Sequence, residues 1–464
     1  MRRCSVDWLA ERYAPERMRE VFSLERRIML WRKLWLALAR HQKRLGLCVI
    51  TDEALAQMKA ALNKIDTERI QELEERLRHD VMANIEAFGE VAPAAHAILH
   101  LGATSYFLVD NADLINIREA LRLLAAYTTH LCRLLLNWAQ RHKNSFCLSY
   151  THLQPAQPTT HGRRACLWLQ DFLSDIKRLG KLAEDLPFRG VKGAVGTQAS
   201  YMILFDGNAK KAEELDKAVA ADFGFSNVMA LTSQIYTRKL DLEVAQAVCQ
   251  LAVSAHKFAQ DIRLLTGLGD LRHKTSRTQV GSSAMPHKRN PVDAERVCAL
   301  CRYVFALEGY VRETASHNWL ERSLDDSAAR RLYIERLFLA AGSAVRYCCR
   351  IVDEFEPSER DISEFVPLLA TEGLLMEASR RGGDRQKLHE ALRRAAAVYQ
   401  QSKNLNAFLE QVEKEGIMRK EEARRFLNVE LLSGRAVEQC ERFLREAEKV
   451  INAQEAVAPE TAGV

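Results

Sequence analysis

The chain carries long stretches in which apolar residues recur at spacings of three and four positions, as they do on one face of an α-helix. The first stripe, with Thr128 in its one polar position, comprises Leu114, Ile117, Leu121, Leu124, Leu131, Leu135 and Trp138. A second stripe is rich in small side chains and comprises Ala245, Val248, Ala252, Ala255, Ala259 and Ile262. Small residues let a neighbouring helix approach closely, so the two stripes predict two long amphipathic helices packed in a bundle.

Proline placement and the scarcity of alternating patterns extend this picture to most of the chain. The ten prolines leave the intervals 94–154, 188–285 and 292–356 free for unbroken helices. Apolar and polar residues rarely alternate, and no strand-and-helix rhythm of a parallel sheet is visible. The sequence therefore predicts an all-α fold with a long central helical bundle and argues against an α/β fold.

Two or three domains are expected, because 464 residues exceed the size at which single cores stop growing. Turn-favouring residues in "HLGATSYFLVDN" (100–111) precede the first long helix, and two prolines with a run of acids mark "DEFEPSERDISEFVP" (353–367). The predicted domains are an N-terminal helical domain over 1–104, a central long-helix domain over 105–357 and a C-terminal helical domain over 358–464.

Composition and charge are those of a folded globular chain. Hydrophobic residues make up 47% and charged residues 28%, which excludes a largely disordered chain. The net charge of +6 comes from 67 basic and 61 acidic residues without a polybasic run, so nucleic-acid binding is not indicated.

Cysteine usage and hydropathy bear on the compartment. Eleven irregularly spaced cysteines in a long chain predict reduced thiols rather than a disulfide framework, and hence a cytoplasmic location. The first residues lack the apolar segment of a secretion signal, and the apolar run at 28–39 is interrupted by Arg32 and Lys33. Neither export nor a membrane span is expected.

The segment "GSSAMPHKRNP" (281–291) concentrates proton carriers and anion binders in a turn-rich stretch with Met285 as its one apolar anchor. Such a loop suits an anionic ligand. A serine in it could act as a base only if its alkoxide were stabilised, and Lys288 and Arg289 are the nearest cations. A solvated surface turn is the alternative.

Two further segments place histidines where proton transfer is possible. In "SYTHLQPAQPTTHGRR" (149–164), His152 precedes two prolines and is expected in a rigid turn, either as an acid or as a histidine bonded to backbone. Arg78, His79 and Asp80 are consecutive, so they can share a site only at a helix start; a solvated charged turn is the alternative.

The segment "NWLERSLDDSAARRLYIERL" (318–337) is rich in arginine. Arginine forks bind phosphate or carboxylate bidentately, whereas the simpler interpretation is a salt-bridged helix face. The polar side chains concerned are Arg322, Ser327, Arg330 and Arg331.

Other suggestive patterns favour structural roles. The glycines of "RGVKGAVGTQAS" (189–200) lack the ending of a phosphate loop and favour a flexible connection between helices. Cys298 and Cys301 have no second pair, which argues against zinc. His96 and His100 lack the glutamate of a metalloprotease and are expected to be core or interface histidines.

Taken together, the segments resemble the fumarase/aspartase superfamily of lyases, whose G-S-S-x-M-P-x-K-x-N-P loop fits 281–291 at every fixed position. Within it, "HLGATS", "RLRHDVMA", "THLQPAQPTT", "RGVKGAVGTQAS", "SSAMPHKRNP" and "LDDSAARR" resemble the adenylosuccinate lyase family in wording and order, over roughly residues 10 to 450. Six separate segments recur together, which outweighs the simpler interpretation of each.

The resemblance implies a fumarase/aspartase-type fold whose bundle forms the core of a homotetramer, with active sites shared between subunits. It implies β-elimination of fumarate from adenylosuccinate and from succinylaminoimidazole carboxamide ribotide, in purine biosynthesis. It implies a small-molecule nucleotide substrate, no metal or organic cofactor, and neither nucleic acid nor membrane as a partner.

The resemblance also assigns roles to residues. His152 would be the general acid, Ser282 the general base, and His79 a support for His152, while Lys288 and Asn290 would stabilise charge on the succinyl carboxylate. Substrate-binding positions would be Arg12, Tyr13, Arg78, Asp80, Thr104, Ser105, Thr151, Gln234, Arg296, Arg322, Ser327 and Arg331. His287 stands where many members have tyrosine and receives no role.

Two alternatives remain open at this point. A sister lyase acting on argininosuccinate or fumarate shares the 281–291 loop, although "RLRHDVMA" and "LDDSAARR" argue against it. A noncatalytic structural protein on the same fold is disfavoured because His152, Ser282 and Lys288 are all retained.

Overall fold

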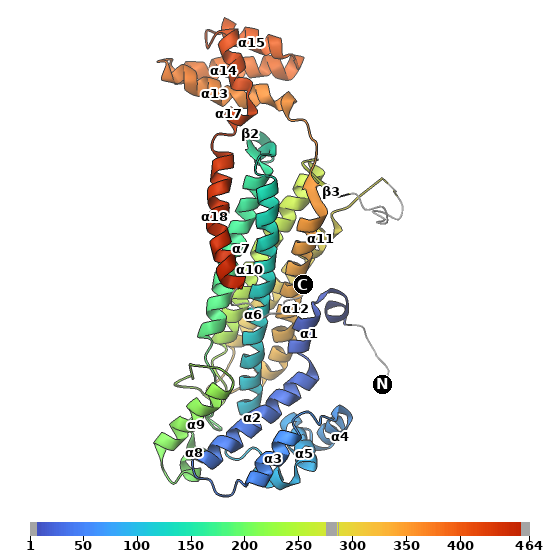
Figure 1. Ribbon diagram of the computed structural model, residues 1–464, viewed down its shortest axis with the longest axis vertical. Coiled ribbons are helices and arrows are strands. Elements are labelled where there is room, and N and C mark those ends of the chain that lie inside the picture. The colour runs from blue at the N-terminus through green and yellow to red at the C-terminus, as the bar shows by residue number, and fades with distance from the viewer. Residues whose placement is uncertain (1–6, 275–284, 286, 456–464) are drawn as a thin grey trace.

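The computed structural model describes residues 7–274, 285 and 287–455 and shows an elongated molecule made almost entirely of helices (Figure 1). Its strands form only two short antiparallel ribbons within these residues, β1 (Phe146–Thr151) with β2 (Gln154–Thr160) and β3 (Leu271–His273) with β4 (Phe355–Pro357). The predicted all-α fold is confirmed.

The centre of the molecule is a bundle of long helices that run side by side along its long axis (Figure 1). These helices are α6 (Ser105–Arg141), α7 (His161–Asp185), α10 (Lys239–Gly267), α11 (Val292–Ser316) and α12 (Asp325–Glu354). Both predicted stripes lie inside α6 and α10, and every one of their residues is buried. With 37 residues at 1.5 Å each, α6 is about 55 Å long.

Of the N-terminal helices, α2 (Leu24–Arg44) to α5 (Asp80–Val91) lie at the lower end of the bundle with α8 (Ala199–Leu204) and α9 (Ala209–Asp222), whereas α1 (Glu16–Val21) lies beside α12 (Figure 1). Arg32 interrupts the apolar face of α2 without being exposed, because its Nη1 donates to the carbonyls of Ala61 (2.6 Å) and Lys64 (2.8 Å). The other elements of the N-terminal region are η1 (Leu9–Tyr13), α3 (Asp52–Ala60), α4 (Thr67–Leu77) and η2 (Pro93–Ile98).

The C-terminal helices gather at the upper end around a separate apolar core that includes Leu374, Leu392 and Phe408 (Figure 1). The last helix, α18 (Ala436–Glu455), returns along the bundle and packs against α6 and α7. The remaining elements are η3 (Ser363–Phe365), α13 (Val366–Arg380), α14 (Arg385–Ser402), α15 (Leu405–Lys414), α16 (Lys420–Ala423), η4 (Arg424–Leu427) and α17 (Val429–Leu432).

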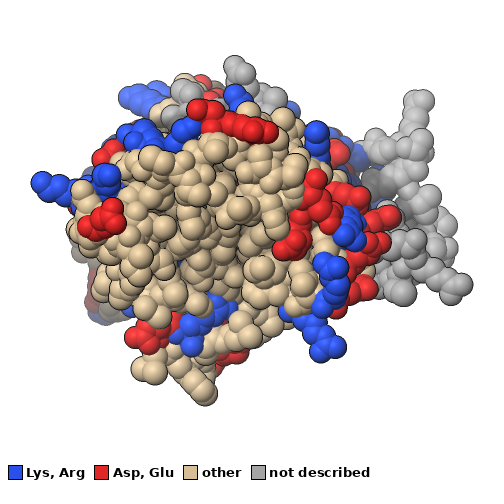
Figure 2. Space-filling model, turned by 90° about the horizontal axis from the view of Figure 1, so that it is seen from below, with Lys and Arg blue, Asp and Glu red and all other residues tan. Residues whose placement is uncertain are grey.

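The surface is uneven in charge. Figure 2 shows the lower end of the molecule, where uncharged residues fill the middle of the face and charged side chains gather near its rim. Among the described residues, no helix combines the length and the apolar character needed to cross a bilayer.

His161 begins α7 and predicts a pH dependence of stability. Its ring is buried against Trp138, and burial, with smaller effects of Arg164 and His142, lowers the pKa of His161 to about 3. The unfolded chain has the ordinary histidine pKa of about 6.5. The unfolded state therefore binds more protons than the folded state, and stability is lost as pH falls from about 6.5 toward about 3.

We expect this loss to be about 2 kcal/mol between pH 7 and pH 5, and to be absent from a His161→Gln protein. Denaturant unfolding at both pH values and one protein concentration measures it. His389→Gln on the exposed side of α14 is the control and should behave like the unmodified protein. Equal pH dependence in all three proteins would contradict the prediction.

Candidate active site

A cavity of about 680 Å³ opens at the lower end of the bundle, between the α4–α5 junction, the start of α6 and the start of α12. Nine residues that the family resemblance assigns to substrate or catalysis line it: Arg78, His79, Asp80, Thr104, Ser105, Gln234, Arg322, Ser327 and Arg331. The structure thus brings together residues from four separate sequence segments.

The α4–α5 junction presents three consecutive polar residues to this cavity. Arg78 ends α4 in the left-handed conformation (φ 52°), and His79 is the N-cap of α5. His79 Nδ1 accepts from the backbone N–H of Met82 (3.4 Å), which leaves Nε2 to carry the proton of the neutral ring. Asp80 pairs with Arg331 (2.6 Å). The helix start that the sequence required for these residues is present.

The N-terminus of α6 faces the same cavity. Thr104 is its N-cap and Ser105 its first residue, and the Thr104 side chain makes no capping hydrogen bond. The first N–H groups of a helix and its dipole favour anions. A phosphate or carboxylate is therefore a suitable ligand at this end of the cavity.

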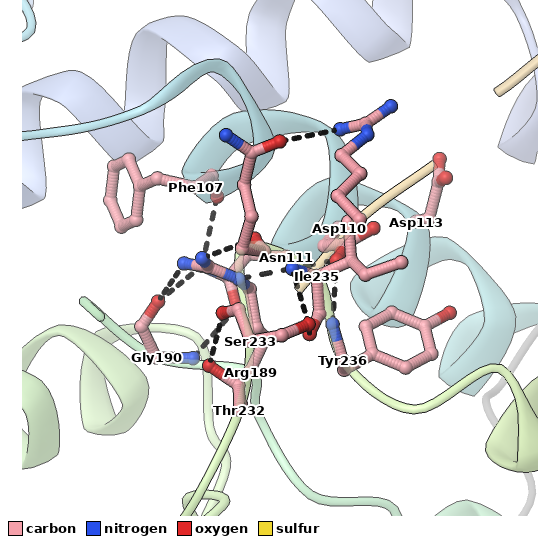
Figure 3. Close-up of polar contacts among 12 residues, drawn as sticks. Phe107, Asp110, Asn111, Asp113, Arg189, Gly190, Thr232, Ser233, Ile235 and Tyr236 are labelled. Carbon is pink, nitrogen blue, oxygen red and sulfur yellow. Dashed lines mark hydrogen bonds and ion pairs between the residues drawn. The ribbon is translucent and has the colours of Figure 1, made fainter. Parts of the chain in front are cut away.

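Gln234 and Arg322 form another wall of the cavity, and both are held in place. Arg322 Nη1 donates to Gln234 Oε1 (3.1 Å), and its guanidinium lies 3.4 Å from the centre of the Tyr106 ring. The backbone carbonyl of Gln234 accepts from Arg189 Nη2 (2.6 Å). Figure 3 shows Arg189 bridging Gly190 and the segment that leads to Tyr236.

A buried ionic cluster lies next to Arg322 and holds it in place. The Asp110 carboxylate pairs with Arg238 (3.0 Å) and Arg330 (3.1 Å) and accepts from the backbone N–H of Tyr236 (3.0 Å; Figure 3). Asp326 pairs with Arg238 (2.7 Å) and lies 3.5 Å from Arg322. Arg322 is therefore fixed by a carboxylate that is itself fixed inside the protein.

The Arg238 guanidinium stays charged despite its burial. Burial and the neighbouring Arg330 act to lower the pKa of Arg238, but Asp110, Tyr236 and Asp241 raise it above the ordinary arginine value. Arg330 forms the salt bridges of the simpler interpretation of 318–337, although it is buried rather than solvated. Arg331, its neighbour, is exposed and lines the cavity.

The glycine-rich segment 189–200 connects α7 and α8, as expected, but its start is buried and is part of the same support. Arg189 is fully buried, and Gly190 N–H donates to Asn111 Oδ1 (3.1 Å; Figure 3). Gly190 has φ +88°, and a Cβ on it would lie 2.1 Å from the Asp216 carboxylate. The glycine permits this approach, so here it serves packing rather than mobility.

His152 occupies a different place, at the tip of the β1–β2 hairpin. Thr151 pairs with Gln154, so His152 (φ 52°) and Leu153 (φ 59°) form a two-residue turn in which both residues are left-handed. Neither is glycine or asparagine, so the turn is strained, as turns at functional sites often are. Thr151, His152 and Leu153 are all exposed.

Five other assigned residues lie in a third place. Lys288 and Asn290 lead into α11, and Arg296 follows in that helix. A cavity of about 320 Å³ brings Arg296 beside Tyr13, which ends η1 directly after the exposed Arg12. Ser282, assigned as the general base, lies outside the described residues.

Two of these places, the cavity and the hairpin, are far apart within one chain. The cavity with His79 lies at the start of α6, and the hairpin with His152 follows the end of that helix, so about 55 Å of helix separates them (Figure 1). One chain alone therefore does not bring its own His79 and His152 to one substrate.

Several cavity residues were not predicted from the sequence: Glu74, Tyr106, Val109 and Leu324. His100 lies beside them, and its Nδ1 accepts from Trp35 Nε1 (3.0 Å). Burial, with His79 adding, lowers the pKa of His100 to about 4, so its ring is neutral. Its expected core role is confirmed, whereas His96 is half exposed and pairs with Glu86 (3.3 Å).

Comparison with known proteins gives a consistent family. A family model described as lyase matches residues 14–306. The adenylosuccinate lyases of Saccharomyces cerevisiae and Schizosaccharomyces pombe are each 41% identical to the chain, over 94% of it and 93% of the relative. The adenylosuccinate lyase of Schistosoma mansoni is also 41% identical, over 83% of this chain and 82% of the relative.

Solved structures agree on the fold. A 3-carboxy-cis,cis-muconate lactonizing enzyme from Pseudomonas putida matches with a TM-score of 0.83 at 26% identity, over 96% of this chain and 99% of that chain. A fumarate lyase from Mesorhizobium sp. BNC1 matches with a TM-score of 0.81 at 22% identity, over 93% and 98%. The fold is that of this group of lyases.

Proposed function

The chain belongs to the adenylosuccinate lyase family and is an enzyme of the carbon–nitrogen lyase class, and we propose that it releases fumarate from adenylosuccinate, leaving AMP, at sites built from several subunits. The observation that carries the proposal is the cavity of about 680 Å³, which falls within the usual range of small-molecule sites. Three arginines and a helix N-terminus around it suit a substrate with one phosphate and two carboxylates.

The proposed chemistry is a β-elimination with proton transfers on two sides of the substrate. Ser282 takes the proton from the carbon beside the succinyl carboxylate, and the resulting charge spreads into that carboxylate beside Lys288 and Asn290. The carbon–nitrogen bond then breaks, and His152 gives a proton to the departing nitrogen. His79 supports His152 and binds the substrate near it, so that the acid and the leaving nitrogen stay correctly placed.

Assembly is the proposed means of joining the three places on the chain, as a homotetramer with four composite sites. Large apolar side chains on three bundle helices support it, because they are exposed in the single chain: Leu167 on α7, Val253 and Leu264 on α10, and Tyr303 and Tyr310 on α11. An antiparallel neighbour would bring its hairpin end to the cavity end of this chain.

We extend the proposal to the second substrate and to the compartment. Succinylaminoimidazole carboxamide ribotide carries the same phosphate and succinyl groups, so the same cavity suits it. The ten cysteines within the described residues are free thiols, which supports a reducing, cytoplasmic location.

A direct assay tests the function. The purified protein is given adenylosuccinate, argininosuccinate or fumarate, and loss of each is followed spectrophotometrically. We expect turnover of adenylosuccinate alone, and an Arg322→Lys protein should show a KM raised by roughly 10-fold or more, because lysine cannot keep the forked contact and the ring stacking. Arg312→Lys, on an exposed α11 pair with Glu308, should leave the KM unchanged. Activity on argininosuccinate or fumarate alone would overturn the assignment.

A further inference from the structure

One buried carboxylate, Asp270, contacts the hairpin that carries His152, close to its turn. It follows the end of α10 directly before β3, and its side chain is only 2% exposed. Its position joins three parts of the chain: the hairpin, the end of α10 and the segment that leads to the C-terminal helices.

The contact to the hairpin comes through Tyr150, two residues before His152. The Tyr150 hydroxyl donates to Asp270 Oδ1 (3.0 Å). Burial, with Asp270 adding, raises the pKa of Tyr150 to about 12, so the hydroxyl keeps its proton and remains a donor. The bond fixes β1 close to the strained turn rather than at its far end.

Two arginines complete the arrangement. Arg360 Nη1 donates to Asp270 Oδ1 (2.8 Å), to the Tyr150 hydroxyl (2.8 Å) and to the carbonyl of Leu268 (2.7 Å). Arg164 at the start of α7 lies 3.7 Å from Asp270 Oδ2 and donates to the carbonyl of Leu148 in β1. The strand is thus held by both side-chain and backbone contacts.

The backbone around Asp270 is fixed as well. Its carbonyl accepts from Ser358 N–H (3.0 Å), and Leu271 pairs with Pro357 across the β3–β4 ribbon. The backbone that carries the Asp270 carboxylate is therefore held by hydrogen bonds, whereas the hairpin tip is exposed. The contacts that bear on the direction of the tip are thus made two residues before His152.

We propose that Tyr150 and Asp270 are positioning residues that aim the His152 hairpin, with Arg360 holding both of them. The inference rests on the proposed role of His152 as the acid. Neither residue lines the candidate cavity or is assigned to substrate, so their loss should slow proton transfer without weakening binding. A displacement of about 1 Å in a catalytic group can cost up to 100-fold in rate.

The test compares two tyrosine-to-phenylalanine proteins. Tyr150→Phe should lower kcat by roughly 10-fold with KM within about two-fold of the unmodified value, because only the aim of the acid changes. Tyr399→Phe is the matched control, since its hydroxyl also donates one hydrogen bond, to the carbonyl of Glu364 (2.8 Å), inside the C-terminal core. It should leave kcat and KM unchanged.

A second measurement separates aiming from folding. Asp270→Asn should resemble Tyr150→Phe in kcat, and AMP should bind both proteins with unchanged affinity in equilibrium dialysis. Adding Tyr150→Phe to a His152→Ala protein should lower its residual rate no further, because both changes act on the same proton transfer. An unchanged kcat in Tyr150→Phe, an equal loss in Tyr399→Phe, or additive losses with His152→Ala would each overturn the proposal.

The outcome stays distinct from that of the proposed function. If the unmodified protein does not consume adenylosuccinate, the function is wrong. If it does, and His152→Ala is fully active, the role of His152 is wrong. If both hold and Tyr150→Phe behaves as unmodified, the positioning inference alone is wrong.

Discussion

Replacing His152 with alanine is expected to lower kcat by about 10³-fold, and mixing that protein with an equally inactive Ser282→Ala protein is expected to restore activity. The loss follows from removing the acid that protonates the leaving nitrogen. Recovery is expected on the proposal that each site draws His152 and Ser282 from different chains, a proposal supported by the position of His79 and His152 at opposite ends of α6. Random mixing leaves roughly a quarter of the sites with both residues intact.

The measurement is the adenylosuccinate assay after the two proteins are mixed, mildly denatured and refolded together. Each variant treated alone is the control, and native mass spectrometry of a size-tagged pair verifies that chains exchange. If hybrids form and no activity appears, His152 and Ser282 of a site do not come from different chains, and the proposed sharing of these two residues is wrong. If either single variant keeps the unmodified rate, the assigned acid or base is wrong.

Replacing Asp110 with asparagine is expected to lower the free energy of unfolding by about 3–5 kcal/mol. The substitution keeps the shape of the side chain but removes the negative charge that faces Arg238 and Arg330, both of which are buried. Breaking a buried network leaves uncompensated charge in a medium that solvates it poorly, and this penalty exceeds the worth of one ordinary hydrogen bond.

Denaturant unfolding at one protein concentration measures the change. Glu90→Gln is the matched control, because Glu90 forms a forked pair with Arg69 on the surface, at 2.7 to 3.2 Å. Water already solvates that pair, so its loss should cost at most about 1 kcal/mol. A smaller cost for Asp110→Asn than for Glu90→Gln would show that the buried cluster does not stabilise the fold.

The sequence predicted the helices of the bundle because their apolar stripes are long and regular, as in α6 and α10. It did not predict the ionic cluster, although a signal was present. Asp110 precedes Leu114 by four positions and so continues the buried stripe of α6. A charged residue on an otherwise apolar face is a sign of a paired, buried charge.

Asp326 and Arg330 give the same signal at the start of α12. They precede Tyr333 and Leu337 at helical spacing, and all four are buried. Arginine content alone did not separate Arg330, inside the protein, from Arg331 at the cavity, since the two are adjacent in the sequence. The angular position on the helix does separate them.

The candidate site was predicted only as far as the motifs extend. They named nine residues that line one cavity, but Glu74, Tyr106, Val109 and Leu324 enter it through the way that α4, α6 and α12 meet. Residues that become neighbours only through the packing of separate helices leave no recognisable spacing pattern in the sequence. The sequence also did not predict the strands β1 and β2 on either side of the His152 turn. The prolines and polar residues of this segment are typical of a loop.

In the proposed assembly, the length of α6 sets the distance between the cavity that a chain offers and the hairpin that it gives to a neighbour. Inserting one helical turn would extend the helix by about 5.4 Å, more than the length of a hydrogen bond, and would move His152 away from the substrate of the neighbouring site. The proposal therefore makes the number of residues in this helix a requirement of the reaction as well as of packing.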